Sequence, residues 1–135
     1  MLANGIKLAY KTTGDTYTEL ADLKQVPDMG EEPEKIENTC LSDTTKQYEF
    51  GIGDYGDLDF TFKYKNDSAT SSYRVLRKLA DDKTVVGFKE TYPDGTSFTF
   101  DAQCSVKLGG GGVNDAIEFT LSLALQSKIA VADPE

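Results

Sequence analysis

Residues 117–125 read IEFTLSLAL, and their alternation decides the fold class. Every odd-numbered position is apolar, whereas the even-numbered positions carry Glu118, Thr120, Ser122 and Ala124. Successive side chains of a β-strand point to opposite faces, so this period of two predicts a strand with one buried face and one polar face.

The same alternation recurs along the chain. It appears in GIKLAY (5–10), KQYEFGI (46–52), LDFTFKY (58–64) and SFTFDAQCSVKL (97–108). YPDGTS (92–97) predicts a hairpin turn, because Pro, Asp and Gly favour turn backbone, and GGGGVND (109–115) predicts a flexible connection. The sequence therefore predicts a mainly β protein.

One segment follows helical spacing instead. In SATSSYRVLRKLADD (68–82), Tyr73, Leu76, Leu79 and Ala80 recur every three or four residues after a run of capping Ser and Thr residues. We expect one helix of about three turns packed on the β core, since its apolar stripe has to be covered. A second short helix over 18–26 is a further expectation.

Composition excludes several classes of function. The 135 residues suit one domain, and the net charge of −9 opposes binding to phosphate backbones. The chain has no His and only two Cys residues, Cys40 and Cys104, so the commonest general base and zinc ligand are missing. Cys104 falls on the apolar face of its strand, and the role of Cys40 stays open. We expect no secretory signal, no membrane span and a reducing cytoplasm.

Residues 51–60 read GIGDYGDLDF, in which Gly51, Gly53 and Gly56 match G-x-G-x-x-G. A dinucleotide loop requires a helix after the motif to hold the pyrophosphate, but an alternating strand follows here. The kinase form would need further motifs that the chain lacks. We interpret the glycines as a turn between two strands of a long hairpin.

The remaining polar clusters do not form a catalytic site. Asp54, Asp57 and Asp59 do not match a calcium loop and are typical of a solvated face. Arg74, Arg77 and Lys78 form the one basic cluster, along the predicted helix, and could contact nucleic acid, a neighbouring subunit or solvent. In so acidic a chain we favour an acidic neighbour or solvent. We expect no enzyme, no cofactor and no metal.

The whole pattern resembles the major tail protein, the tail tube subunit, of long-tailed bacteriophages. The resemblance covers nearly the whole chain and is most specific in IENTCLSD (36–43), YPDGTSFTF (92–100) and DAIEFTLSLALQSK (115–128). It implies a β-sandwich or barrel-like core with one flanking α-helix and a long β-hairpin. Some members carry an extra C-terminal immunoglobulin-like domain, and we expect none within 1–135.

The resemblance also implies a function. Hexameric rings would stack into a virion tail tube, assembled in the host bacterial cytoplasm, that encloses a tape measure protein and later conducts DNA without binding it specifically. Tail terminator and baseplate or tip proteins would be further partners.

The resemblance assigns roles to particular residues. Segment 41–57 would be the ring-to-ring hairpin, and its contact residues would be Tyr48, Phe50, Gly51, Gly53, Asp54, Tyr55 and Gly56. Phe50 could equally belong to the core. The lumen-facing candidates are Asp59, Thr61, Glu118, Thr120 and Ser122. The outward face of 118–124 lacks basic residues that could hold DNA, whereas the outward face of 58–64 includes Lys63. Arg74, Arg77 and Lys78 are candidates for a subunit contact.

Two other functions stay open. A tube protein of type VI secretion systems would share the architecture. A cytoplasmic β-barrel that binds a small ligand would instead remain monomeric and enclose a pocket.

Overall fold

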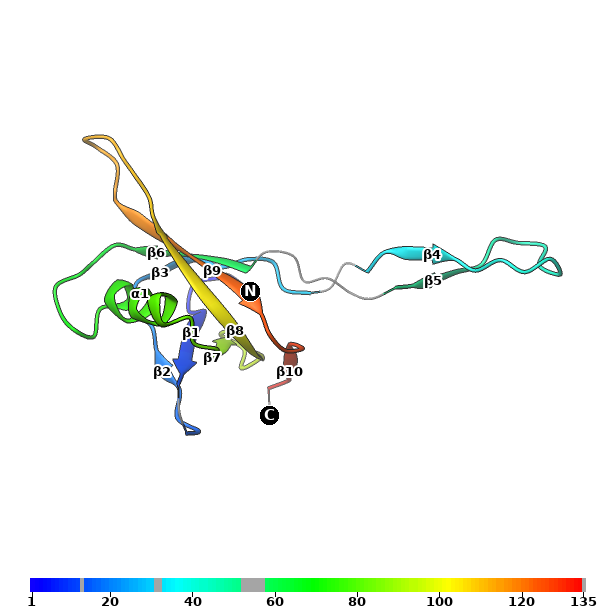
Figure 1. Cartoon of the computed structure of the whole chain (residues 1–135), viewed down its shortest axis with the longest axis horizontal. Helices are drawn as coiled ribbons and strands as arrows, with labels where there is room; N and C mark the ends of the chain where they lie inside the picture. Colours follow the sequence, from blue (N-terminus) through cyan, green and yellow to red (C-terminus); the bar gives the residue numbers. More distant parts are fainter. Residues whose placement is uncertain (13, 31–32, 52–57, 135) are drawn as a thin grey trace.

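The fold was analysed in a computed structural model, which describes all residues except 13, 31–32, 52–57 and 135. The described residues form ten strands and one helix, arranged as a large sheet, a separate hairpin and a helix on the sheet (Figure 1). The elements are β1 (Lys7–Lys11), β2 (Thr18–Glu19), β3 (Leu23–Gln25), β4 (Lys35–Glu37), β5 (Tyr48–Phe50), β6 (Leu58–Lys63), α1 (Ser72–Asp82), β7 (Val86–Thr91), β8 (Ser97–Leu108), β9 (Glu118–Leu125) and β10 (Ala130–Ala132).

The large sheet runs in the order β2-β1-β7-β8-β9-β6-β3, and all its pairs are antiparallel. Strand β8 is long enough to pair with β7 along one edge and with both β9 and β10 along the other. The strands predicted from alternation at 5–10, 58–64, 97–108 and 117–125 are thus confirmed.

The sheet is closed by the segment that runs from β2 to β3. Leu20 donates its N–H to the Leu8 carbonyl, and the Asp22 carbonyl accepts the Lys63 N–H, each at 2.8 Å. The segment therefore joins the β1 edge to the β6 edge, with a left-handed bend at Asp22 (φ 69°). The helix expected over 18–26 is wrong, because these backbone groups bond to two separate strands rather than to one another.

Aromatic side chains fill the interior of the closed sheet. Phe60, Phe62, Phe88 and Phe119 are fully buried, and the Phe62 and Phe119 rings stack at 5.1 Å. Removing each such side chain from water contributes roughly 1.5–3 kcal/mol. Buried Cys104 confirms the core position predicted for that residue.

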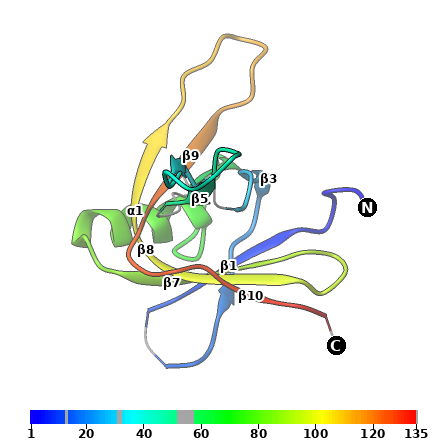
Figure 2. The same cartoon turned by 90° about the vertical axis from the view of Figure 1, so that its right-hand side faces the viewer.

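Helix α1 lies over the apolar face of the sheet, against β8 (Figure 2). Its Leu76 is fully buried and its Tyr73 ring meets Phe119 edge-on at 5.4 Å, as the helical spacing predicts. Buried Ser72 donates to the Ala21 carbonyl at 2.7 Å, which ties the start of the helix to the closing segment. In the described residues, no helix is long and apolar enough to cross a bilayer.

The turn predicted at 92–97 is present. Gly95 adopts φ 101°, a conformation that glycine tolerates best, and Thr96 donates its N–H to the Asp94 carboxylate at 3.0 Å. That bond holds the pKa of Asp94 below its usual value.

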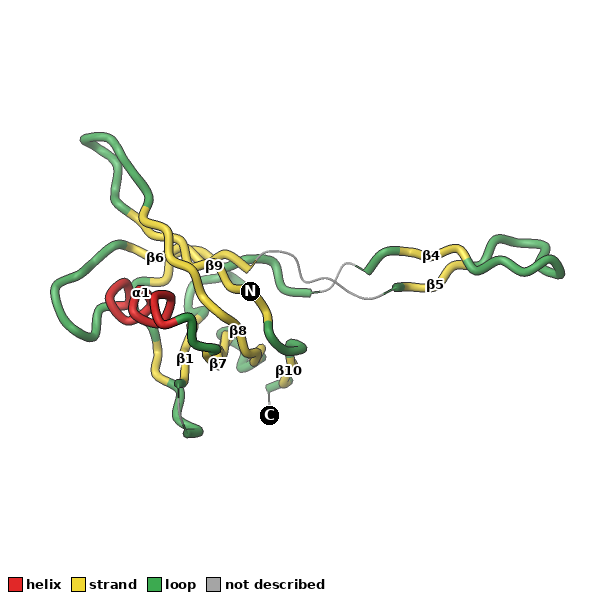
Figure 3. The backbone as a smooth tube through the Cα atoms, viewed as in Figure 1, coloured by secondary structure: helices red, strands yellow, loops and turns green. Residues whose placement is uncertain are grey.

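The pairing of β5 differs from the prediction. We expected the 46–52 strand to form a hairpin with 58–64, but β5 pairs with β4, and β6 pairs with β9 and β3. Strand β4 has a single apolar residue, Ile36, so alternation could not reveal it. The resulting β4–β5 hairpin stands well away from the sheet and helix (Figure 3).

Candidate assembly surfaces

The β4–β5 hairpin exposes apolar side chains. Lys35 lies opposite Phe50 and Glu37 opposite Tyr48, and Tyr48 and Phe50 are 59% and 67% exposed. Cross-strand partners share a face, so these four residues form one surface, which we call the aromatic face. Phe50 does not belong to the core of the subunit. Large apolar side chains exposed together are typical of a contact surface.

The opposite side of the hairpin has a different composition. Ile36 pairs with Glu49, and Gly51 donates its N–H to the Glu34 carbonyl at 2.7 Å. We call Glu34, Ile36 and Glu49 the acidic face. A side chain at Gly51 would meet the Ile36 Cδ1 atom at 3.0 Å, so Ile36 lies flat over the bare glycine.

The remaining hairpin candidates cannot be placed. Gly53, Asp54, Tyr55 and Gly56 lie outside the described residues, so their assignment stays a prediction. Asp57, the last residue of the predicted ring-to-ring segment, lies outside them too.

The five lumen candidates lie together on one face of the sheet. In the β6–β9 register, Asp59 pairs with Ser122 and Thr61 with Thr120. Glu118 completes the row opposite Lys63. Side chains of these residues are exposed or half-buried, on the side of the sheet away from the aromatic core. We call this surface the polar face.

Strand β8 extends the polar face with residues that sequence reasoning did not assign to it. Ser105 pairs with Ser122 and Lys107 with Thr120, and the Lys24 ammonium forms an ion pair with the Glu118 carboxylate. Strand β9, which carries Glu118, has no basic residue. The polar face as a whole does have them, because Lys63 on β6 and Lys107 on β8 lie on either side of β9. Alternation identified the outward residues of β8, but only the register shows which of them lie beside β9.

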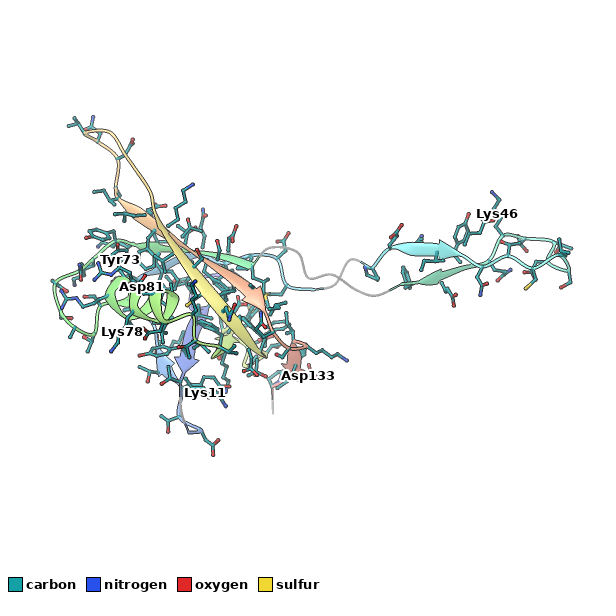
Figure 4. The ribbon with its side chains drawn as sticks, in the orientation of Figure 1. Lys11, Lys46, Tyr73, Lys78, Asp81 and Asp133 are labelled. Atoms are coloured by element: carbon teal, nitrogen blue, oxygen red, sulfur yellow. The ribbon has the colours of Figure 1, made fainter. Side chains whose placement is uncertain are left out.

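The three basic residues of α1 line a groove of about 840 Å³ beside the helix. Arg74 donates from Nε to the Asn66 side-chain oxygen at 2.9 Å, and the Arg77 guanidinium lies 5.4 Å from the centre of the Tyr73 ring. Lys78 is exposed (Figure 4). In the part of the chain that the structure describes, none of the three forms an ion pair.

One ionisable group in the core was not predicted. Glu90 on β7 is fully buried, opposite Leu8 and Phe98, and within the described residues neither carboxylate oxygen has a hydrogen-bond partner. Burial raises the pKa of Glu90 to about 7. The signal that could have found it is the position of Glu90 two residues after Phe88, which places both side chains on the same face of β7.

Similarity to known proteins is found over almost the whole chain. The tail of an empty gene transfer agent particle with C6 symmetry has a subunit of similar fold (TM-score 0.71, 18% identity, 96% of this chain and 98% of the other). A native gene transfer agent virion has another (TM-score 0.72, 14%, 98% and 98%), as does the baseplate of an anti-feeding prophage (TM-score 0.71, 12%, 98% and 95%).

These structural likenesses are accompanied by a family match. No curated sequence matches the chain. The sequence model of the phage tail tube proteins, however, matches residues 3–134. The mainly β fold with one helix is that of tail tube proteins, as the resemblance of the sequence implied. The chain belongs to the phage tail tube protein family, whose members are structural proteins of virion tails.

Proposed function

We propose that copies of this chain, each acting as one domain over 1–135, assemble into stacked hexameric rings that form the conduit for DNA ejection. The observation that carries the proposal is the β4–β5 hairpin, whose aromatic face has no covering element among the described residues. An isolated two-stranded hairpin is marginally stable in water, so a neighbouring subunit that covers Tyr48 and Phe50 would stabilise it.

The polar face suits the wall of a conduit. Its centre consists of Thr61, Thr120, Ser105 and Ser122, which are small and uncharged. Tight binding of DNA requires many neutralised phosphates, and here Lys24 is already paired with Glu118. Asp59 offsets part of the positive charge of Lys63 and Lys107 on the same face, and each copy of the chain carries a net charge of −9, which repels a duplex at long range.

The structural relatives support the proposed partners. One solved relative has C6 symmetry, and others come from a baseplate and from a sheath and tube terminator. By analogy, this chain would contact a terminator and a baseplate or tip protein. The proposal also includes a tape measure protein inside the tube, which the resemblance of the sequence implies. Assembly would take place in the cytoplasm of the host bacterium.

The test is tube formation by the purified chain and by a hairpin variant. Electron microscopy and light scattering over a wide concentration range should show rings or tubes for the unmodified chain. Tyr48→Ser with Phe50→Ser should remain folded but lose the tubes, because those side chains contribute little to the monomer. Normal tubes from the double variant would contradict the role of the hairpin.

A type VI secretion tube is the second candidate. One such secretion protein shares the fold with a TM-score of 0.53 and 13% identity over 90% of this chain, a weaker likeness than that of the gene transfer agent tails. A ligand-binding barrel is less compatible with the structure, because aromatic side chains fill the interior of the sheet.

A further inference from the structure

The β4–β5 hairpin and α1 lie at opposite ends of the molecule (Figure 1). Residues of α1 line the groove described above. A head-to-tail contact between identical copies joins different surfaces and can propagate. Copies stacked along the long axis would bring the hairpin of one to the helix end of the next.

The charges of these two surfaces are complementary. The acidic face carries Glu34 and Glu49, and within the described residues neither forms an ion pair. The groove carries Arg74, Arg77 and Lys78, with Asp81 and Asp82 confined to the C-terminal end of the helix. A chain of net charge −9 repels its own copies, so this basic cluster is where another copy would be attracted.

The apolar parts of the two surfaces are complementary as well. Ile36 is 49% exposed on the acidic face, with Glu49 directly across the hairpin and Glu34 two residues before it. The lining of the groove also includes the half-buried apolar residues Tyr10, Val75 and Leu79. An aliphatic side chain seated in such a groove, with charged pairs around it, is the usual composition of a specific contact.

We propose that the acidic face of one copy docks in the α1 groove of the next copy. Ile36 enters the groove, and Glu34 and Glu49 meet the basic residues of the helix. The proposal rests on the proposed self-assembly and names the receiving surface for the hairpin. The aromatic face, on the other side of the hairpin, remains free to contact a second subunit.

Charge reversal tests the dock. A helix-reversed variant carries Arg74→Glu and Lys78→Glu, and a hairpin-reversed variant carries Glu34→Lys and Glu49→Lys. Each alone should need at least about tenfold more protein to form tubes, because like charges then face each other. An equimolar mixture should restore tubes, since alternating copies place opposite charges at every contact. Both reversals in one chain should restore them too.

Glu37→Lys in the helix-reversed chain is the matched control for Glu49→Lys in the same chain, because each reverses one charge and the two lie on opposite faces of the hairpin. Glu49→Lys should restore tubes in part, and Glu37→Lys should not. Equal restoration by the two, or unchanged tubes from both reversed variants, would overturn the dock. Should Arg74→Glu unfold the helix by circular dichroism, Lys78→Glu alone carries the test, since Lys78 is exposed.

The unmodified chain separates the two proposals. Tubes from the unmodified chain, with no rescue in the mixture, would overturn the dock and leave the tube role standing. If the unmodified chain forms no tubes at any concentration, the proposed self-assembly fails and the dock fails with it.

Discussion

Two hairpins of this molecule differ in how far the rest of the subunit supports them. The β8–β9 hairpin has seven cross-strand pairs from Ala102 to Leu108, and one of its faces packs under α1. The β4–β5 hairpin has three pairs, and every residue of its strands is exposed. The first is stabilised within the subunit, whereas the second lacks such support and is suited to become ordered against a neighbour.

Hydrogen exchange should give the largest difference between the hairpins. In the monomer, amides of Leu121 and Leu123 should exchange only through global unfolding, which slows exchange by about 10⁴-fold or more. The amides of Asn38 and Gly51 should exchange close to the unprotected rate, although each donates a hydrogen bond. Equal protection of both hairpins in the monomer would contradict the difference in support. Protection of the β4–β5 hairpin that appears only in tubes would show that a neighbouring subunit stabilises it.

Truncation of the β9 core should be the next largest effect. Phe119→Ala should lower the free energy of unfolding by about 3–5 kcal/mol, because Phe119 stacks on Phe62 and meets Tyr73. Phe50→Ala should change it by no more than about 0.5 kcal/mol, because Phe50 is 67% exposed. Urea denaturation of the two monomers measures both values. A loss above about 2 kcal/mol for Phe50→Ala would show that the hairpin packs on its own subunit.

Glu90 should make the stability of the sheet depend on pH. Its pKa is raised to about 7 in the folded state, so the carboxyl stays protonated there while an unfolded chain would already be ionised. The free energy of unfolding should therefore be greatest below about pH 4.5 and fall by roughly 3 kcal/mol as the pH rises to 7.

Glu90→Gln isolates that contribution. The variant should lose this part of the pH dependence, measured as the difference in urea midpoint from the unmodified chain at pH 5 and pH 8. Burial raises the pKa of Tyr92, and the charges of Glu90 and Asp28 raise it further; Tyr92 and Asp28 are both retained in the variant. An unchanged pH profile would show that Glu90 is ionised in the folded state. Substitutions in the β4–β5 hairpin should leave the pH dependence of the free energy of unfolding unchanged.

The smallest effect concerns DNA. Glu118→Lys, Thr120→Lys and Ser122→Lys together should make assembled tubes retain DNA. The apparent binding constant should become more dependent on salt by roughly 0.9 logarithmic units per contacted phosphate. Thr16→Lys, Thr18→Lys and Glu19→Lys add the same charge at β2 and the turn before it, and they serve as the control. Equal retention by both sets would contradict the lumen assignment.

The sequence could predict elements whose pattern is long enough to show a period. The eight-residue β9, the twelve-residue β8 and the eleven-residue α1 all emerged from alternation or helical spacing. The segment from β2 to β3 was not predicted correctly, because its Leu20, Leu23 and Val26 recur every three residues, a spacing that also fits a helix. Its actual conformation is set by the distant partners Leu8 and Lys63.

The candidate surfaces were predictable only in part. Alternation grouped Glu118, Thr120 and Ser122, but the place of Lys107 beside Thr120 depends on inter-strand register. The pairing of β5 with β4 likewise depends on a turn that no local sequence pattern predicts. Register and pairing are long-range properties, and a single sequence carries little information on them.

The order of strands in the closed sheet also has a consequence for synthesis of the chain on the ribosome. Strand β9, at residues 118–125, is the strand that pairs with both β6 and β8. The β6-β3 part and the β2-β1-β7-β8 part of the sheet cannot be joined side by side until β9 has left the ribosome, because antiparallel pairing requires both strands. The hairpin emerges much earlier, while the helix groove that we propose as its receptor forms only with the finished sheet. On the proposed dock, a nascent chain that lacks β9 would present the hairpin but would not receive one, so polymerisation would wait until β9 has emerged.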